Sequence, residues 1–299
     1  MKYILIFILS LPLQVWGQSN CVLNTDTTPI RFGGIIQDVK ITSQRPKYVR
    51  LKGYYRSYQS NDSVLKYYVD GIVEYYINLK NGKLDVINYG NRHLRNNELI
   101  SKDRKRAFML SDQATFRPWL EGTTYIEECK KKYEQKDSIG KLFLLKDNHT
   151  FGFIKKDSLN KSCSIEVDKL PTYNKLTHSL FGYTQEIVNE HFTEAYQLTS
   201  DDYYSFKNLL FQKTDQSYTY WYKKDTHKQF IHVITELYIT EQEYQDDKTN
   251  KPHSKFSPKE ATQLIENFQI SHHIPELAPN IKAETESLQY YDPSNLRKK

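Results

Sequence analysis

The segment from 65 to 79 constrains the fold most, because its side chains alternate between an apolar and a more polar set. The apolar set is Leu65, Tyr67, Val69, Gly71, Val73, Tyr75, Ile77 and Leu79. An alternation of period two is typical of a half-buried β-strand. Asn81-Gly82 follows and favours a two-residue hairpin turn. The sequence therefore predicts a hairpin in which Leu79 faces Leu84 and Ile77 faces Val86.

Further strands are predicted on both sides of this hairpin. Residues 48–58 read as a strand before it, so that a first group of hairpins spans 48–89. Two more hairpin regions are expected near 141–169 and 217–240, because short β-type runs there are separated by turn-forming residues. In the last region the apolar residues Ile231, Val233, Leu237 and Ile239 are expected to share a face. The sequence therefore predicts strands throughout the chain, joined as antiparallel hairpins.

Helix signals are fewer and lie mainly in the second half of the chain. Ser257-Pro258-Lys259-Glu260 places an N-cap serine, a proline at the first helical position and the glutamate of a capping box. The apolar residues Ala261, Leu264, Ile265 and Phe268 then fall on one helical face. Two weaker helices are predicted over 200–211 and 185–198.

These patterns together predict an α+β fold. It is β-rich, with an antiparallel curved sheet or partial barrel and two or three helices mainly in the C-terminal half. Three parts are expected: a signal peptide over 1–17, a single β-rich domain over 18–255, and a C-terminal helix with a polar tail over 256–299.

The N-terminus predicts export. Lys2 precedes a short apolar run that is broken at Pro12, and the residues before Gln18 suit cleavage by signal peptidase. A lipid anchor on Cys21 would need a small residue before it, and Asn20 stands there instead. No later run is apolar and long enough to span a bilayer. We therefore expect an exported protein that is periplasmic, outer-membrane associated or secreted, and sequons at Asn61, Asn148 and Asn160 leave a eukaryotic secreted origin open.

Charge and motifs exclude several classes of function. The net charge of +6 is small and evenly spread, which argues against nucleic-acid binding. No HExxH, GxSxG, Walker or Rossmann pattern occurs, and this disfavours the common metalloproteases, α/β-hydrolases and nucleotide enzymes. His191 and Glu194 could share a helical turn, but no third metal ligand stands at a suitable spacing. Neither a cofactor nor a metal is therefore predicted.

The cysteines allow two arrangements. Because there are three of them, Cys21, Cys129 and Cys163 cannot all pair within one chain. In an oxidising compartment Cys129 and Cys163 could form a disulfide, or both could remain buried thiols.

Two groups of residues are candidates for ligand binding. On the predicted strand, Tyr68, Ile72 and Tyr76 share one face and form an aromatic stripe. A helix of the same chain would cover this stripe, or else a ligand or partner would. Arg104, Lys105 and Arg106 belong to the densest basic stretch, which could meet anionic lipid headgroups or an acidic glycan. A solvated loop is the alternative for this stretch.

Residues 45–80 also resemble a known group of proteins. The segments Arg45-Pro46-Lys47-Tyr48-Val49-Arg50-Leu51-Lys52-Gly53-Tyr54-Tyr55-Arg56 and Tyr67-Tyr68-Val69-Asp70-Gly71-Ile72-Val73-Glu74-Tyr75-Tyr76 carry the resemblance. They are similar to a segment that follows carboxypeptidase-like regulatory domains in uncharacterised cell-envelope proteins of the Bacteroidetes type. The resemblance implies residence in the cell envelope and assigns no catalytic residue.

Two classes of function follow. We favour a non-enzymatic envelope protein that binds a lipid, a glycan or a partner protein. The alternative is a hydrolase of envelope polymers, in which carboxylates such as Asp70 and Glu74, or histidines such as His191, would converge in a cleft. Convergence within hydrogen-bond reach is the test of this alternative.

Overall fold

One antiparallel sheet organises the protein in the computed structural model. The structure describes residues 46–96, 129, 131–138, 140–147, 149–157, 159, 161–168, 177–180, 182–198, 206–248 and 256–290. The predicted signal peptide, Cys21 and Arg104, Lys105 and Arg106 lie outside these residues.

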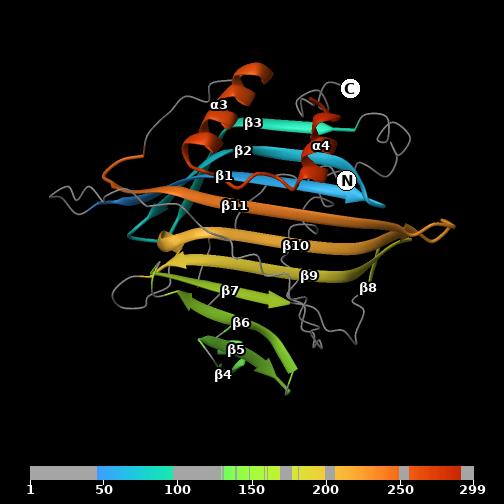
Figure 1. The fold of residues 1–299 in the computed structure, drawn as a ribbon, viewed down its shortest axis with the longest axis horizontal. Helices are drawn as coiled ribbons and strands as arrows, with labels where there is room; N and C mark the ends of the chain where they lie inside the picture. The colour runs from blue at the N-terminus through green and yellow to red at the C-terminus, as the bar shows by residue number, and fades with distance from the viewer. Residues whose placement is uncertain are drawn as a thin grey trace, which may run out of the picture.

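The sheet has twelve strands in these ranges. They are β1 (Tyr48–Asn61), β2 (Val64–Asn78), β3 (Leu84–Arg95), β4 (Glu134–Ser138), β5 (Lys141–Lys146), β6 (His149–Asp157), β7 (Ser162–Asp168), β8 (Thr177–Leu180), β9 (Tyr183–Gln197), β10 (Leu209–Tyr222), β11 (Gln229–Gln245) and β12 (Gln289–Tyr290). Their order is β12-β3-β2-β1-β11-β10-β9-β7-β6-β5-β4, with β8 beside β9. The sheet is open, so the α+β prediction with a curved antiparallel sheet is confirmed (Figure 1).

The pairing of β1 with β11 joins the two ends of the sequence. Tyr54 lies opposite Tyr238, and the ladder runs from Tyr48 with Gln245 to Asn61 with Ile231. The first hairpins and the last hairpin therefore belong to one continuous sheet rather than to separate units. A glycine is required where the two strands approach closely, because a Cβ on Gly53 would lie 2.2 Å from the Tyr238 carbonyl oxygen.

The hairpin predicted around Asn81-Gly82 forms, but its register differs. Ile77 lies opposite Leu84, where the sequence predicted Val86, and the loop is longer than two residues. Asn78 ends the strand early, because its side-chain oxygen accepts from the Lys80 amide at 2.9 Å. The shift equals two residues, so the side chains from Val69 to Ile77 keep their predicted faces. Leu65 does not, because an irregularity in the pairing of β1 with β2 places it on the same face as Tyr68.

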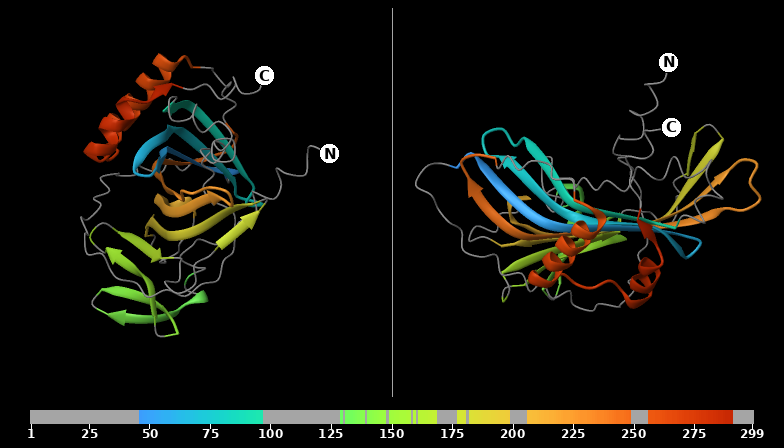
Figure 2. Two further views of the ribbon diagram at one scale, coloured as in Figure 1. Left: turned by 90° about the vertical axis from the view of Figure 1, so that its right-hand side faces the viewer. Right: turned by 90° about the horizontal axis from the view of Figure 1, so that it is seen from above.

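Two helices, α3 (Pro258–Ser271) and α4 (Pro279–Glu286), lie on one side of the sheet. Figure 2 shows both on this side, which we call the helix face. The predicted capping box at Ser257 and Glu260 is present. Ile265 and Phe268 are buried against the sheet, in a cluster that includes Ile72 of β2. The prediction of this helix is confirmed, whereas α4 and β12 stand in the segment predicted as a polar tail.

The two weaker helix predictions were wrong over the described residues. Residues 185–197 belong to β9, and 206–208 form a short 3-10 turn before β10 begins at Leu209. β9 pairs with β10 on one side and with β7 on the other. The apolar spacing of this segment suits a helix and a strand alike, and strand pairing on both sides decided between them.

The opposite face of the sheet holds the largest hydrophobic cluster. Its buried members are Val49, Leu51, Tyr55, Val69, Val73, Tyr75, Cys129, Tyr133, Leu144, Phe151, Ile154, Cys163, Ile165, Val167, Tyr196, Leu209, Leu237 and Ile239. Strands from both halves of the curved sheet contribute to it. Cys129 and Cys163 both lie in this cluster as buried thiols, the second of the two predicted arrangements.

Candidate functional site

The predicted aromatic stripe is covered by the chain itself. Tyr68, Ile72 and Tyr76 are 2%, 1% and 0% exposed. Ile72 packs against α3, and Tyr68 packs against Leu288, which follows α4. Of the two alternatives for this stripe, the structure shows cover by the same chain, with α3 over Ile72.

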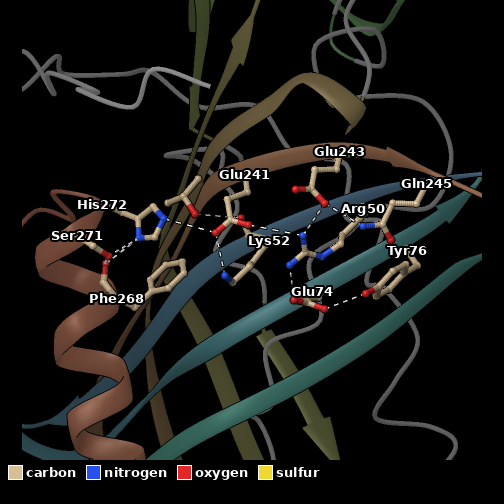
Figure 3. A network of polar contacts seen from close by, with 11 residues as sticks. Arg50, Lys52, Glu74, Tyr76, Glu241, Glu243, Gln245, Phe268, Ser271 and His272 are labelled. Carbon is tan, nitrogen blue, oxygen red and sulfur yellow. Dashed lines mark hydrogen bonds and ion pairs between the residues drawn. The ribbon is translucent and has the colours of Figure 1, made fainter. Parts of the chain in front are cut away.

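Buried ion pairs lie between these aromatic residues, on the same face of β2. Figure 3 shows Arg50 between Glu74 and Glu243. Its guanidinium nitrogens lie 2.6 Å from a Glu74 oxygen and 2.9 Å from a Glu243 oxygen. The Tyr76 hydroxyl donates to the other Glu74 oxygen at 2.9 Å. Glu74 is 1% exposed, so this carboxylate is held inside the protein and is not a cleft residue.

A second group of ion pairs forms a row across five neighbouring strands. The strand register aligns one charged residue from each of β3, β2, β1, β11 and β10. In this order they are Arg92, Asp70, Arg56, Glu236 and Lys213. The sign of the charge alternates along this row. Each buried charge thus has an opposite charge on the adjacent strand, as burial requires.

Asp70 fixes the side chain of Arg92 in a defined position. Arg92 Nε and Nη2 donate to the two Asp70 oxygens at 3.0 and 2.6 Å. The Tyr54 and Tyr68 hydroxyls also donate to Asp70, at 3.1 and 2.9 Å. Burial and the negative charge of Asp70 raise the pKa of Tyr68, so this hydroxyl remains a neutral donor. Such a bidentate, buried contact leaves Arg92 little rotational freedom.

Arg92 lies at an open groove between α3 and the β3 edge of the sheet. The groove has a volume of about 630 Å³ and is lined by Arg92, Leu94, Pro258, Lys259, Thr262, Gln263, Glu266 and Tyr290. Binding sites for small ligands are commonly about 300–1,000 Å³ in volume. Gly90 allows α3 to approach, because a Cβ there would lie 2.7 Å from a Leu264 methyl carbon. We identify this groove as the candidate functional site.

The groove combines hydrogen-bonding groups with apolar surface. Arg92 Nη1 lies 3.9 Å from the exposed carboxylate of Glu266. Tyr290 is 41% exposed and offers an aromatic ring from the short strand β12. Sequence reasoning missed this site, because its residues come from 92–94, 258–266 and 290 and become neighbours only when α3 packs on the sheet. The single local signal was the helix start at Ser257.

His191 lies outside the groove, on a part of the helix face formed by β7, β9 and β10. It stands opposite Asp168 on one side and Asp215 on the other. Its Nδ1 lies 2.7 Å from Asp168 Oδ1, and its Nε2 lies 3.3 Å from the Thr193 hydroxyl oxygen. The hydrogen bond with Asp168 raises the pKa of His191, burial opposes this, and the charges of Glu166 and Asp215 add to the rise.

We expect the contribution of His191 to stability to depend on pH. Because the pKa of His191 is higher in the folded chain, this contribution is complete below about pH 6.5, the unfolded value, and is lost as pH rises through the folded value. His191→Gln should therefore destabilise the protein more at about pH 5.5 than at about pH 8.5 in urea titrations. In an Asp168→Asn background this pH dependence should shrink, and an equal effect at both pH values would contradict the assignment.

The strand geometry separates His191 and Glu194, which a helix would have brought together as metal ligands. His191 and Glu194 are three residues apart on β9, so they lie on opposite faces of the sheet. Glu194 accepts from Gln212 at 2.8 Å and from the Tyr196 hydroxyl. Within the described ranges, His, Cys, Asp and Glu side chains form no group of three that could hold a metal ion. The helices in those ranges are also too short or too polar to cross a bilayer.

Comparison with known proteins gives likenesses to solved structures. No family model matches the chain, and no curated protein matches it in sequence. A solved structure described as "Lipid-protein interactions in lipovitellin" is similar, with a TM-score of 0.33 and 8% sequence identity. The likeness covers 70% of this chain and 26% of that chain, so this chain spans about a quarter of its length. A TM-score this low does not establish a shared fold.

Proposed function

We propose that this is an exported cell-envelope protein that binds a glycan in the groove between α3 and β3. The signal-type N-terminus and the resemblance of residues 45–80 to envelope proteins support the location. The observation that carries the binding proposal is Arg92, held at the groove by the buried carboxylate of Asp70. When a donor side chain is already fixed, ligand binding costs less free energy, because that side chain need not be ordered.

The chemistry of the lining favours a saccharide. A sugar ring presents hydroxyl groups at its edge and C–H groups on its faces. Thr262, Gln263 and Glu266 offer donors and acceptors for the hydroxyl groups, and Leu94 and the ring of Tyr290 offer apolar contact for the faces. Because the groove is open, a longer chain can extend beyond it.

The same lining favours binding over glycoside hydrolysis. Hydrolysis of a glycosidic bond commonly uses two carboxyl groups on either side of the bond. Among the residues that line the groove, Glu266 alone carries a carboxylate. Asp70 lies behind Arg92 and is 0% exposed, so it cannot serve as the second group.

Removing the groove's hydrogen-bonding side chains should weaken glycan binding. A hydrogen bond to a charged group contributes about 1.5–3 kcal/mol, so Glu266→Ala should raise the Kd roughly tenfold or more. Gln263→Ala should raise it less, since that side chain is neutral. The measurement is a screen of neutral, amino-sugar and uronic-acid oligosaccharides, followed by calorimetry on the tightest binder.

Asn267→Ala is the matched control, because Asn267 is exposed on the same helix and does not line the groove. It should bind like the unmodified protein. The proposal fails if no oligosaccharide binds, or if Glu266→Ala and Asn267→Ala bind equally well. Recovery of the bound oligosaccharide as shorter products would favour the hydrolase instead.

A further inference from the structure

A second surface lies at one end of the sheet, where two hairpin tips project. The β8–β9 turn contains Gly182, and the β10–β11 turn spans 223–228. The Lys223 amide donates to the Gly182 carbonyl at 2.8 Å, so the two tips lie side by side. Figures 1 and 2 show this end of β8 to β11 extending past the helices. None of the groove residues belongs to it.

The tips carry aromatic side chains on both faces. Tyr183 stacks on Tyr220, with ring centres 5.5 Å apart, and also contacts Tyr222 at 4.9 Å. Trp221 stands between Tyr220 and Tyr222 in the strand and therefore points to the other face. Phe230 lies on that face too, because it is opposite Thr219, and it is 37% exposed. Phe230 is exposed and the other four rings are half-buried, so part of this aromatic cluster reaches solvent, as at interaction surfaces.

Lysines flank these aromatic residues. Lys223, Lys224 and Lys228 are exposed in or next to the turn. The ammonium group of Lys228 lies 4.0 Å from the centre of the Trp221 ring and 3.9 Å from a Glu186 oxygen. Asp225 is the acidic residue of the turn, and its carboxylate accepts from the Tyr222 amide. The turn therefore has an excess of positive charge beside apolar rings.

We propose that these hairpin tips dock on an anionic lipid surface. Tryptophan and tyrosine suit the membrane interface, because the apolar ring enters the acyl boundary while the polar atom stays hydrated. Lysines beside them meet the headgroup phosphates. The tips would rest in the interface without crossing the bilayer. This docking is independent of glycan binding, and it would leave the groove free to hold a glycan.

Vesicle binding by the chain from Gln18 onward tests the proposal. We expect sedimentation with vesicles that contain phosphatidylglycerol and little binding to phosphatidylcholine alone. Lys223→Glu with Lys224→Glu should weaken binding at least tenfold, and so should Trp221→Ala with Phe230→Ser. In a Trp119→Phe background, the fluorescence of Trp221 should shift to the blue when anionic vesicles are added.

Lys155→Glu with Lys156→Glu is the matched control, since this pair is exposed on β6. It should bind vesicles like the unmodified protein, and circular dichroism should show all variants folded. The proposal is overturned if the control pair weakens binding as much as the tip pair, because the attraction would then be nonspecific. It is also overturned if the tip variants bind vesicles as tightly as the unmodified protein, or if binding does not depend on the charge of the lipid.

Discussion

Replacing Asp70 with asparagine should lower the free energy of unfolding by about 3–5 kcal/mol. Asp70 is 0% exposed and accepts from Arg92, Tyr54 and Tyr68. The amide keeps the size of the carboxyl group but carries no charge. Arg92, whose side chain is 16% exposed, would then be left with its weaker contact to the exposed Glu266 carboxylate at 3.9 Å. Urea unfolding at neutral pH measures the loss.

Two comparison variants test whether the loss of stability comes from the buried ion pair rather than from the removal of a charge in general. Glu276→Gln removes a pair with Lys282 whose side chains are 81% and 55% exposed, and it should leave stability unchanged. Arg92→Met added to Asp70→Asn should recover part of the loss, because the uncompensated charge is gone. A loss below about 1 kcal/mol for Asp70→Asn would show that water reaches the pair.

Replacing Phe268 with alanine should cost about 3–5 kcal/mol, as truncations of buried aromatic residues do. Phe268 is 6% exposed, packs in a cluster with Tyr54 and Ile72, and stacks on His272 at 4.1 Å. Truncation would leave a cavity between α3 and the sheet. Because α3 forms one wall of the groove, we also expect faster hydrogen exchange in this helix and weaker glycan binding.

Ile270→Ala provides the control on the same helix. Ile270 is 73% exposed, so its truncation should change stability by no more than about 0.5 kcal/mol. If the two variants were equally stable, α3 would not be held by its apolar face. Unchanged exchange in α3 of the Phe268 variant would likewise contradict the packing described here.

Local patterns predicted much of the fold. The alternation assigned the side chains of β2 from Val69 to Ile77 to the correct face but not Leu65, and the capping box located the start of α3 at Ser257. The helix predicted from the same kind of pattern over 185–198 was wrong. Its apolar spacing suits a helix as well as a strand, and pairing with β7 and β10 made this segment the strand β9. The predicted register of the hairpin was also wrong, because the Asn78 side chain ends the strand before the Asn81-Gly82 pair.

The candidate site was the least predictable part. The hydrolase alternative placed Asp70 and Glu74 in a cleft, but both are buried against arginines from neighbouring strands. Arg92 follows Asp70 by 22 positions, and Arg50 precedes Glu74 by 24. No pattern in the sequence marks these residues as partners, because pairing across strands depends on register.

The sequence by itself determined which face the β2 residues from Val69 to Ile77 occupy and where α3 begins, because these features depend on residues only a few positions apart. Tertiary structure alone decided that β1 pairs with β11, that the carboxylates of β2 are neutralised inside the protein, and that α3 closes a groove beside β3. These outcomes require contacts between segments up to about two hundred residues apart, such as Tyr48 with Gln245. Their free energy is gained only when the whole sheet assembles.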